Sequence, residues 1–135
     1  MLSCVAVALT IFWVAAFAWG RTRFLDVADL SRATIAVTLL STVITAPLFE
    51  EKVVRDLLLR GFASLTNPLI STIAVSLAFA LVHDGAVLWS FLFSLVLCVL
   101  TLKWNVGTLQ RALVHGLLNL LVLAWYATKG YGFFA

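Results

Sequence analysis

The feature that most constrains this chain is a series of five apolar segments, each close to the length that crosses a membrane. A helix needs roughly 17–25 apolar residues to cross the hydrocarbon core. The chain has 135 residues, of which 64% are hydrophobic and 11% are charged, whereas a soluble domain is roughly half apolar and a quarter charged. We therefore predict an all-α, polytopic membrane helix bundle. Its helices are expected at about 2–19, 32–62, 69–83, 86–102 and 108–128.

Short polar segments separate the expected helices. Ser31 can cap the second helix, and Pro68, after Asn67, suits the first turn of the third. Further turn signals lie at 21–29, 84–85, 103–107 and Gly130. Because no linker or repeat interrupts this pattern, we expect a single integral-membrane domain over 1–135.

The charge of the chain favours lipid as its partner. The net charge of +3 is small and scattered, which indicates anchoring at loops and helix ends and no nucleic-acid partner. The first segment lacks a basic region before its apolar run, so we expect a transmembrane helix there and not a signal peptide. Together these features predict a multi-pass protein of a cell membrane.

The second segment concentrates charge where it is costly. Glu50, Glu51, Lys52, Arg55 and Asp56 all lie in it, and charge in a membrane helix costs about 2.5–3.5 kcal/mol per residue on insertion scales. Two i,i+4 pairs, Lys52 with Asp56 and Glu51 with Arg55, can offset part of this cost. Glu50 has only valines at its i+3 and i+4 positions. We expect Arg55 to neutralise Glu51 and to fix the helix face that presents Glu50.

Two other apolar segments carry polar groups. "FALVHDG" places His83 four residues after Phe79, and "LVHGLLN" places His115 and Asn119 on one helix face. Either histidine, taken singly, could simply bond a backbone carbonyl. At 1.5 Å per residue from one side of the bilayer, Glu50 lies about 18 Å deep, His83 about 22 Å, His115 about 12 Å and Asn119 about 18 Å. We therefore expect these four groups to meet in one layer between the helices.

Such a set of side chains suits hydrolysis. Glu50 can deprotonate a water molecule, and His83 can hold that water and shuttle its proton. His115 and Asn119 can donate hydrogen bonds to the oxyanion of a tetrahedral intermediate. The sequence therefore predicts an enzyme that activates water inside the membrane.

The same residues carry a family resemblance. Residues 50–55 fit E-E-x-x-x-R, 79–83 fit F-x-x-x-H and 115–119 fit H-x-x-x-N. In this order and spacing they resemble the CPBP family of intramembrane proteases, also called the CAAX-protease and bacteriocin-processing or Abi family. The stretch "TLKWNVGTLQRALVH" also resembles the usual lead-in to the last motif. The likeness covers a core of about 41–126.

The resemblance implies a glutamic-type intramembrane endopeptidase without a resident cofactor. Glu50 matches the general base, His83 the water-holding histidine, and His115 with Asn119 the oxyanion pair. The implied substrates are membrane-embedded or lipid-modified proteins or peptides, with C-terminal tails or sorting tags as the processed segments. The matching supporting residues are Glu51, Arg55 and Phe79.

The chain departs from the family pattern in two positions. Lys52 stands where the family often has an apolar residue, and Asp56 stands where it often has glycine. The chain is also shorter than many members. We therefore expect that a homo-oligomer or a partner subunit contributes to sealing the pocket.

Two alternatives stay open at this point. A glutamate and two histidines can ligate zinc with one open position, although the chain has no H-E-x-x-H sequence. The other alternative is a non-catalytic bacteriocin-immunity or helper membrane protein that keeps the pocket only as structure. Zinc dependence separates the first from a glutamate mechanism, and the effect of Glu50→Gln separates the second.

Overall fold

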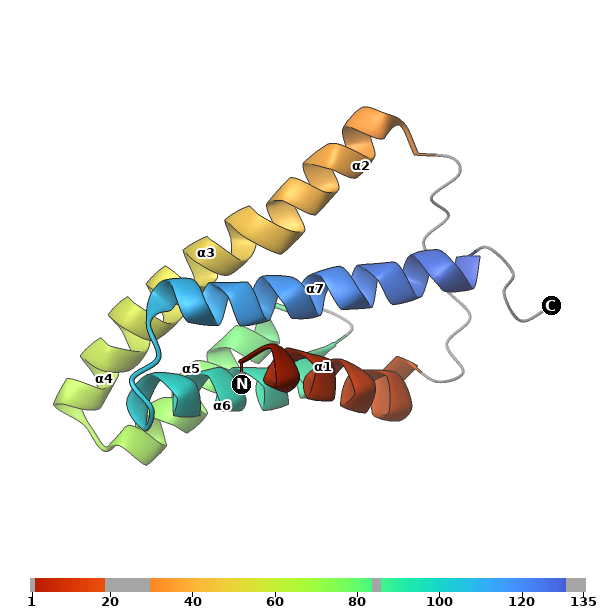
Figure 1. The fold of residues 1–135 in the computed structure, drawn as a ribbon. Coiled ribbons are helices and arrows are strands. Elements are labelled where there is room, and N and C mark those ends of the chain that lie inside the picture. The colour runs from red at the N-terminus through yellow and green to blue at the C-terminus, as the bar shows by residue number, and fades with distance from the viewer. Residues whose placement is uncertain (1, 19–29, 84–85, 131–135) are drawn as a thin grey trace. The chain divides into compact units, whose positions relative to one another are not determined.

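The described part of the chain consists of helices. The computed structural model describes residues 2–18, 30–83 and 86–130, and no strand occurs among them (Figure 1). These residues form five continuous helices, as expected. Their bounds are Leu2–Trp13 (α1) continued by the π-helical turn Val14–Ala18 (η1), then Arg32–Leu65, Pro68–Leu81 (α5), Val87–Leu102 (α6) and Thr108–Gly130 (α7). The prediction of an all-α membrane helix bundle is confirmed.

The second helix changes its winding along its length. It comprises Arg32–Leu39 (α2), the π-helical Leu40–Thr45 (η2), Ala46–Glu50 (α3), the π-helical Glu51–Leu59 (η3) and Arg60–Leu65 (α4). A π-helix pairs residue i with i+5 and usually appears as a single turn, often at a functional site. The nine residues of η3 are therefore unusual, and they begin directly after Glu50.

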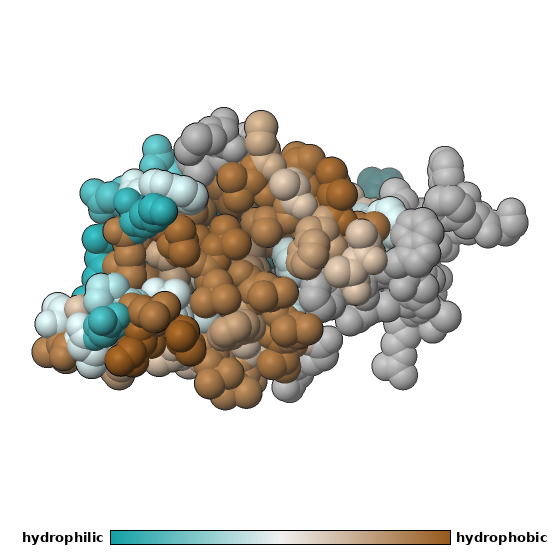
Figure 2. Space-filling view, turned by 90° about the horizontal axis from the view of Figure 1, so that it is seen from below, coloured by the Kyte–Doolittle hydropathy of each residue, from teal (hydrophilic) through white to brown (hydrophobic). Residues whose placement is uncertain are grey.

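Two of the described helices are long and apolar enough to cross a membrane, by length and composition. They are Arg32–Leu65, with 34 residues, and Thr108–Ala127, with 20. The apolar stretches Cys4–Ala16, Pro68–Leu81 and Val87–Leu102 are shorter. Hydrophobic residues dominate the surface in Figure 2, and Leu65, Leu69 and Val82 are among the large apolar side chains that are exposed. Exposed apolar surface on this scale is suited to contact with lipid.

The predicted helix starts are present at two positions. The Ser31 hydroxyl accepts a hydrogen bond from the Thr34 amide at 3.1 Å, and the Asn67 side chain accepts one from the Leu69 amide at 2.8 Å, with Pro68 in the first turn. The second helix ends at Leu65, three residues later than expected. The expected turns at 21–29 and 84–85 lie outside the described residues.

The chain divides into two compact units, and each is described by itself. The first comprises Met1–Pro47 with Leu113–Ala135, and the second comprises Leu48–Ala112. The prediction of a single domain over the whole chain stays a prediction.

The second unit is built on α5 and α6 packed against η3. Leu59, Val75 and Cys98 form its apolar cluster. Several buried positions carry small side chains, and Ser76 lies 3.6 Å from the Cys98 sulfur. Small residues let helices approach closely, which is how helices associate where lipid removes the hydrophobic driving force.

The first unit holds a close approach between η2 and α7. A Cβ atom built on Gly116 would overlap with the carbonyl oxygen of Val43, so this position requires glycine. One turn later, the Asn119 amide donates a hydrogen bond to the Thr42 carbonyl at 2.9 Å. In the same unit the Trp13 and Tyr126 rings meet edge to face at a centroid distance of 5.4 Å.

This close approach predicts that Gly116→Ala destabilises the protein. Because the atom in the way belongs to the backbone, the helices must separate, and overpacking of this kind typically costs about 1–3 kcal/mol. The measurement is the thermal unfolding midpoint of the purified protein in detergent. Gly61→Ala is the matched control, since a Cβ there meets nothing within 4 Å and alanine favours a helix by about 1 kcal/mol over glycine. Equal midpoints for wild type and Gly116→Ala would contradict the close approach.

Candidate active site

An apolar groove of about 520 Å³ opens in the second unit, between the second helix and α5. Its lining is hydrophobic except for two polar side chains, Glu50 and His83. The structure therefore brings these two predicted site residues together along one groove. The apolar side chains around them include Phe49, Val54, Leu58, Phe62, Val75 and Phe79.

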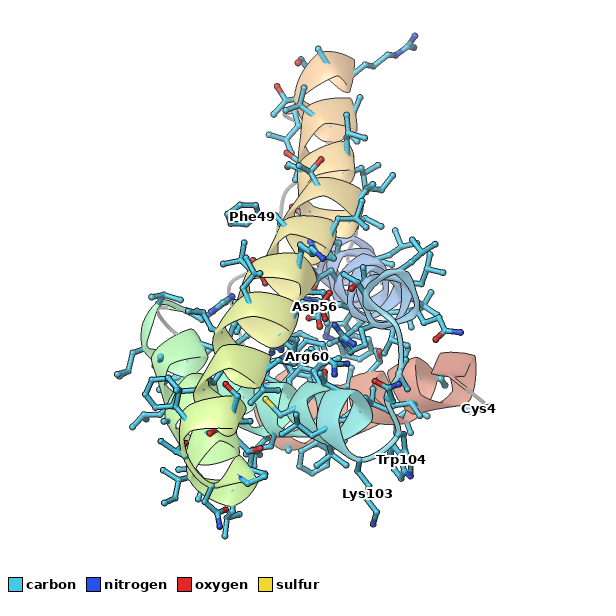
Figure 3. All side chains as sticks on the ribbon, turned by 90° about the vertical axis from the view of Figure 1, so that its left-hand side faces the viewer. Cys4, Phe49, Asp56, Arg60, Lys103 and Trp104 are labelled. Atoms are coloured by element: carbon cyan, nitrogen blue, oxygen red, sulfur yellow. The ribbon has the colours of Figure 1, made fainter. Side chains whose placement is uncertain are left out.

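Glu50 and Glu51 are neighbours in sequence with different surroundings. Glu50 is half-buried in the groove lining, whereas Glu51 is fully buried against arginines. Successive helical residues are rotated by roughly 100°, so the two carboxylates leave the helix in different directions. In Figure 3, Phe49 and Asp56 likewise project from different sides of this helix.

His83 lies just beyond the end of α5 and not within the helix as expected. The helix ends at Leu81, because Val82 leaves helical geometry with φ −87° and ψ 0°. The His83 amide bonds the Ala80 carbonyl at 3.0 Å, and its ring Nδ1 lies 2.7 Å from the Phe79 carbonyl oxygen. A carbonyl oxygen can only accept, so Nδ1 carries the hydrogen and Nε2 of the neutral ring is left as an acceptor.

Arg55 links three elements of the second unit. Its Nη1 lies 3.7 Å from Glu51 Oε1, and its Nη2 donates to the Ser94 hydroxyl of α6 at 3.0 Å. The guanidinium also lies 4.3 Å from the centre of the Phe79 ring, which in turn packs against the His83 ring at 4.3 Å between centroids. The predicted supporting residues Glu51, Arg55 and Phe79 are thus in mutual contact or share a partner, and Phe79 connects them to the groove that it lines.

Arg111 is a residue of this cluster that the sequence analysis missed. It is fully buried, with Nε 3.2 Å from Glu51 Oε2 and Nη2 2.7 Å from Asp56 Oδ1. Its Nη1 donates to the Val106 carbonyl. One signal could have revealed it: an arginine in an otherwise apolar helix needs an acidic partner, and the second helix contains more than one acid.

Asp56 has partners from two helices. Besides Arg111, it receives hydrogen bonds from Thr108 and Lys52, the latter at 3.4 Å, and Arg60 Nε lies 3.7 Å from it. The predicted pair of Lys52 and Asp56 is therefore present, on the exposed side of the cluster. The buried part, Glu51 and Asp56 with Arg55 and Arg111, carries two negative and two positive charges and is neutral as a group.

His115 and Asn119 belong to the other unit. His115 is buried, and Asn119 uses one N–H of its amide on the Thr42 carbonyl. An asparagine amide carries two N–H hydrogens, so this bond leaves the second one for another acceptor. The convergence of these two residues with Glu50 and His83 stays a prediction.

A metal site needs several metal-binding side chains close together. Within 2–18, 30–83 and 86–130, no three His, Cys, Asp or Glu side chains are grouped so that they could hold a metal ion. Zinc dependence is therefore a question for experiment.

Comparison with known protein families identifies the chain. The family described as "Type II CAAX prenyl endopeptidase Rce1-like" matches residues 32–121, which is two thirds of the sequence and includes all three motifs. The chain belongs to this family. The resemblance seen in the sequence is confirmed, and the protein is a membrane protein of the intramembrane-protease class. No curated protein and no solved structure gives a significant match.

The buried charge cluster predicts that Arg55→Ala impairs folding as well as activity. Removing one partner of a buried ion pair typically costs about 3–5 kcal/mol, and here it also leaves the cluster with a net negative charge. The measurement is the yield of folded protein in membranes together with its unfolding midpoint. Lys52→Ala is the control, because its side chain is 63% exposed and exposed pairs contribute about 0–1 kcal/mol. Normal stability of Arg55→Ala would show that Arg55 is not a structural residue.

Proposed function

We propose that this protein is a glutamate-dependent intramembrane endopeptidase. The observation that carries the proposal is that Glu50 and His83 are the two polar side chains of an otherwise apolar groove. Placing a carboxylate in an apolar groove inside a membrane costs free energy, and such residues are usually functional. Membership of a protease family makes activation of water the task that fits both side chains.

In the proposed mechanism, Glu50 takes a proton from a water molecule held between its carboxylate and the acceptor nitrogen of His83. The water oxygen forms a bond to the carbonyl carbon of the peptide, whose double-bond electrons move to its oxygen. His115 and Asn119 are the proposed donors to that oxyanion. Collapse of the intermediate breaks the carbon–nitrogen bond, and the proton on Glu50 passes to the departing amine.

The apolar lining supports a hydrophobic substrate. Aromatic and aliphatic side chains on both walls of the groove favour a lipid chain or an apolar peptide segment over a charged one. We propose membrane-embedded or lipid-modified proteins or peptides as substrates, cut near a C-terminal tail or sorting tag. The proposed location is the bacterial inner membrane, with the protein spanning it several times, either as a homo-oligomer or with a partner subunit.

The decisive experiment measures cleavage of quenched fluorescent peptides with a prenylated C-terminal cysteine by the protein in liposomes. Glu50→Gln keeps the shape of the side chain but removes the base, so turnover should fall by about 10²–10⁴-fold. His83→Ala should also lose most activity, because the water loses its second contact. Lys52→Gln, outside the groove, should remain close to wild type. Near-normal turnover by Glu50→Gln would refute the glutamate mechanism. If cells that carry Glu50→Gln keep the wild-type phenotype, the immunity or helper function is favoured.

A metal-free mechanism predicts resistance to chelators. We propose that no ion takes part, so extended treatment with a zinc chelator should leave turnover unchanged. The measurement is the initial cleavage rate before and after chelation, with a zinc protease treated in parallel as a positive control. Loss of activity that returns on addition of zinc would support the metalloprotease alternative.

A further inference from the structure

One guanidinium contacts two acids of the helix that carries Glu50. Arg111 reaches Glu51 at 3.2 Å and Asp56 at 2.7 Å, and these acids lie five residues apart. Arg111 and Glu51 are fully buried, and Asp56 is half-buried, with 19% of its side chain exposed. The contact with Glu51 is therefore shielded from water, where charge-assisted bonds are strong.

The spacing of five is incompatible with one face of an α-helix. At 3.6 residues per turn, side chains five positions apart are rotated by roughly 140° from each other. In a π-helix the hydrogen bonds join i to i+5, so such side chains lie nearly above one another. Glu51 and Asp56 both lie in the π-helical Glu51–Leu59. The wide turn is therefore what allows a single arginine to bind both carboxylates.

The same wide turn begins next to the groove. Glu50 is the last residue before η3, so the winding of η3 sets the register between Glu50 and the groove residues that follow it, Val54 and Leu58. If η3 rewound as an α-helix, these residues would rotate relative to Glu50. The contacts of Arg111 with both carboxylates favour the π-helical form of η3 over an α-helical form.

We propose that Arg111 is a positioning residue: by binding Glu51 and Asp56 together, it holds the π-helical turn that keeps Glu50 at the groove beside His83. The proposal rests on the proposed function insofar as Glu50 is the base. It also gives a role to Asp56, which stands where the family often has glycine. Asp56 is the second carboxylate that Arg111 binds.

The kinetic test compares Arg111→Met, Arg111→Lys and Arg60→Met with wild type in the peptide assay. Arg111→Met should lower kcat by about 100-fold, since a displacement of about 1 Å at a catalytic group has effects of this size, while KM stays nearly constant. Arg111→Lys should not restore kcat, because one ammonium group lacks the fork that spans two carboxylates. Arg60→Met is the matched control, since Arg60 also contacts Asp56 but is 43% exposed. Full activity of Arg111→Met or of Arg111→Lys would overturn the proposal.

A second test needs no substrate. Glu50→Cys is introduced in a Cys4→Ser background, because Cys4 is exposed and Cys98 is buried, and its alkylation by a membrane-permeant maleimide is timed. Adding Arg111→Met should raise the rate severalfold as the side chain is released from the groove, whereas adding Arg60→Met should not. Equal rates in the three backgrounds would overturn the proposal.

The two tests separate the possible failures. If wild type cleaves no peptide, the proposed function fails and the alkylation rates alone decide the role of Arg111. If Arg111→Met does not fold, as judged by its unfolding midpoint, Asp56→Asn takes its place in both tests. Asp56→Asn leaves the ion pair between Arg111 and Glu51 and removes the charge of the second carboxylate, so a smaller change in the same direction is expected, and no change overturns the proposal.

Discussion

The structure of the second unit depends on pairing acidic with basic side chains in its interior, where water is scarce. Glu51 and Asp56 face Arg55 and Arg111 at distances of 2.7 to 3.7 Å, and three of these four side chains are fully buried. An isolated charge in this position would cost several kcal/mol, and pairing offsets that cost only when the geometry is good. Because the partners come from η3 and from the start of α7, neutrality also ties these two segments together.

Pairing of charges gives the two acids of the doublet different surroundings. Glu51 is committed to arginines and acts as part of the scaffold. Glu50, one position earlier, lies in the groove lining near His83. Phe79 joins the two environments, since its ring contacts both the Arg55 guanidinium and the His83 imidazole. In this arrangement Phe79 connects the apolar groove, which it lines, with the ionic cluster, which it contacts through Arg55.

Two local ion pairs and two helix starts could be inferred from spacing along the chain. Glu51 with Arg55 and Lys52 with Asp56 follow the i,i+4 rule, and both pairs are present. The helix starts at Ser31 and Asn67 follow from side chains that accept amide hydrogens, and both caps are present. The position of His83 was less predictable: the apolar pattern runs on to it, but the helix ends at Leu81, and the ring bonds the Phe79 carbonyl instead.

The sequence by itself determined the five helices, two of their caps and the three motifs, because each depends on residues within a few positions of one another, and the order of the motifs along the chain indicated the family. Only the tertiary structure showed that Arg111 serves both Glu51 and Asp56, since those partners lie more than fifty residues away and sequence spacing carries no information about such contacts. It also decided the π-helical winding of Glu51–Leu59. Local propensity favours the α-helix there, and contacts with another segment of the chain are needed to stabilise the wider turn.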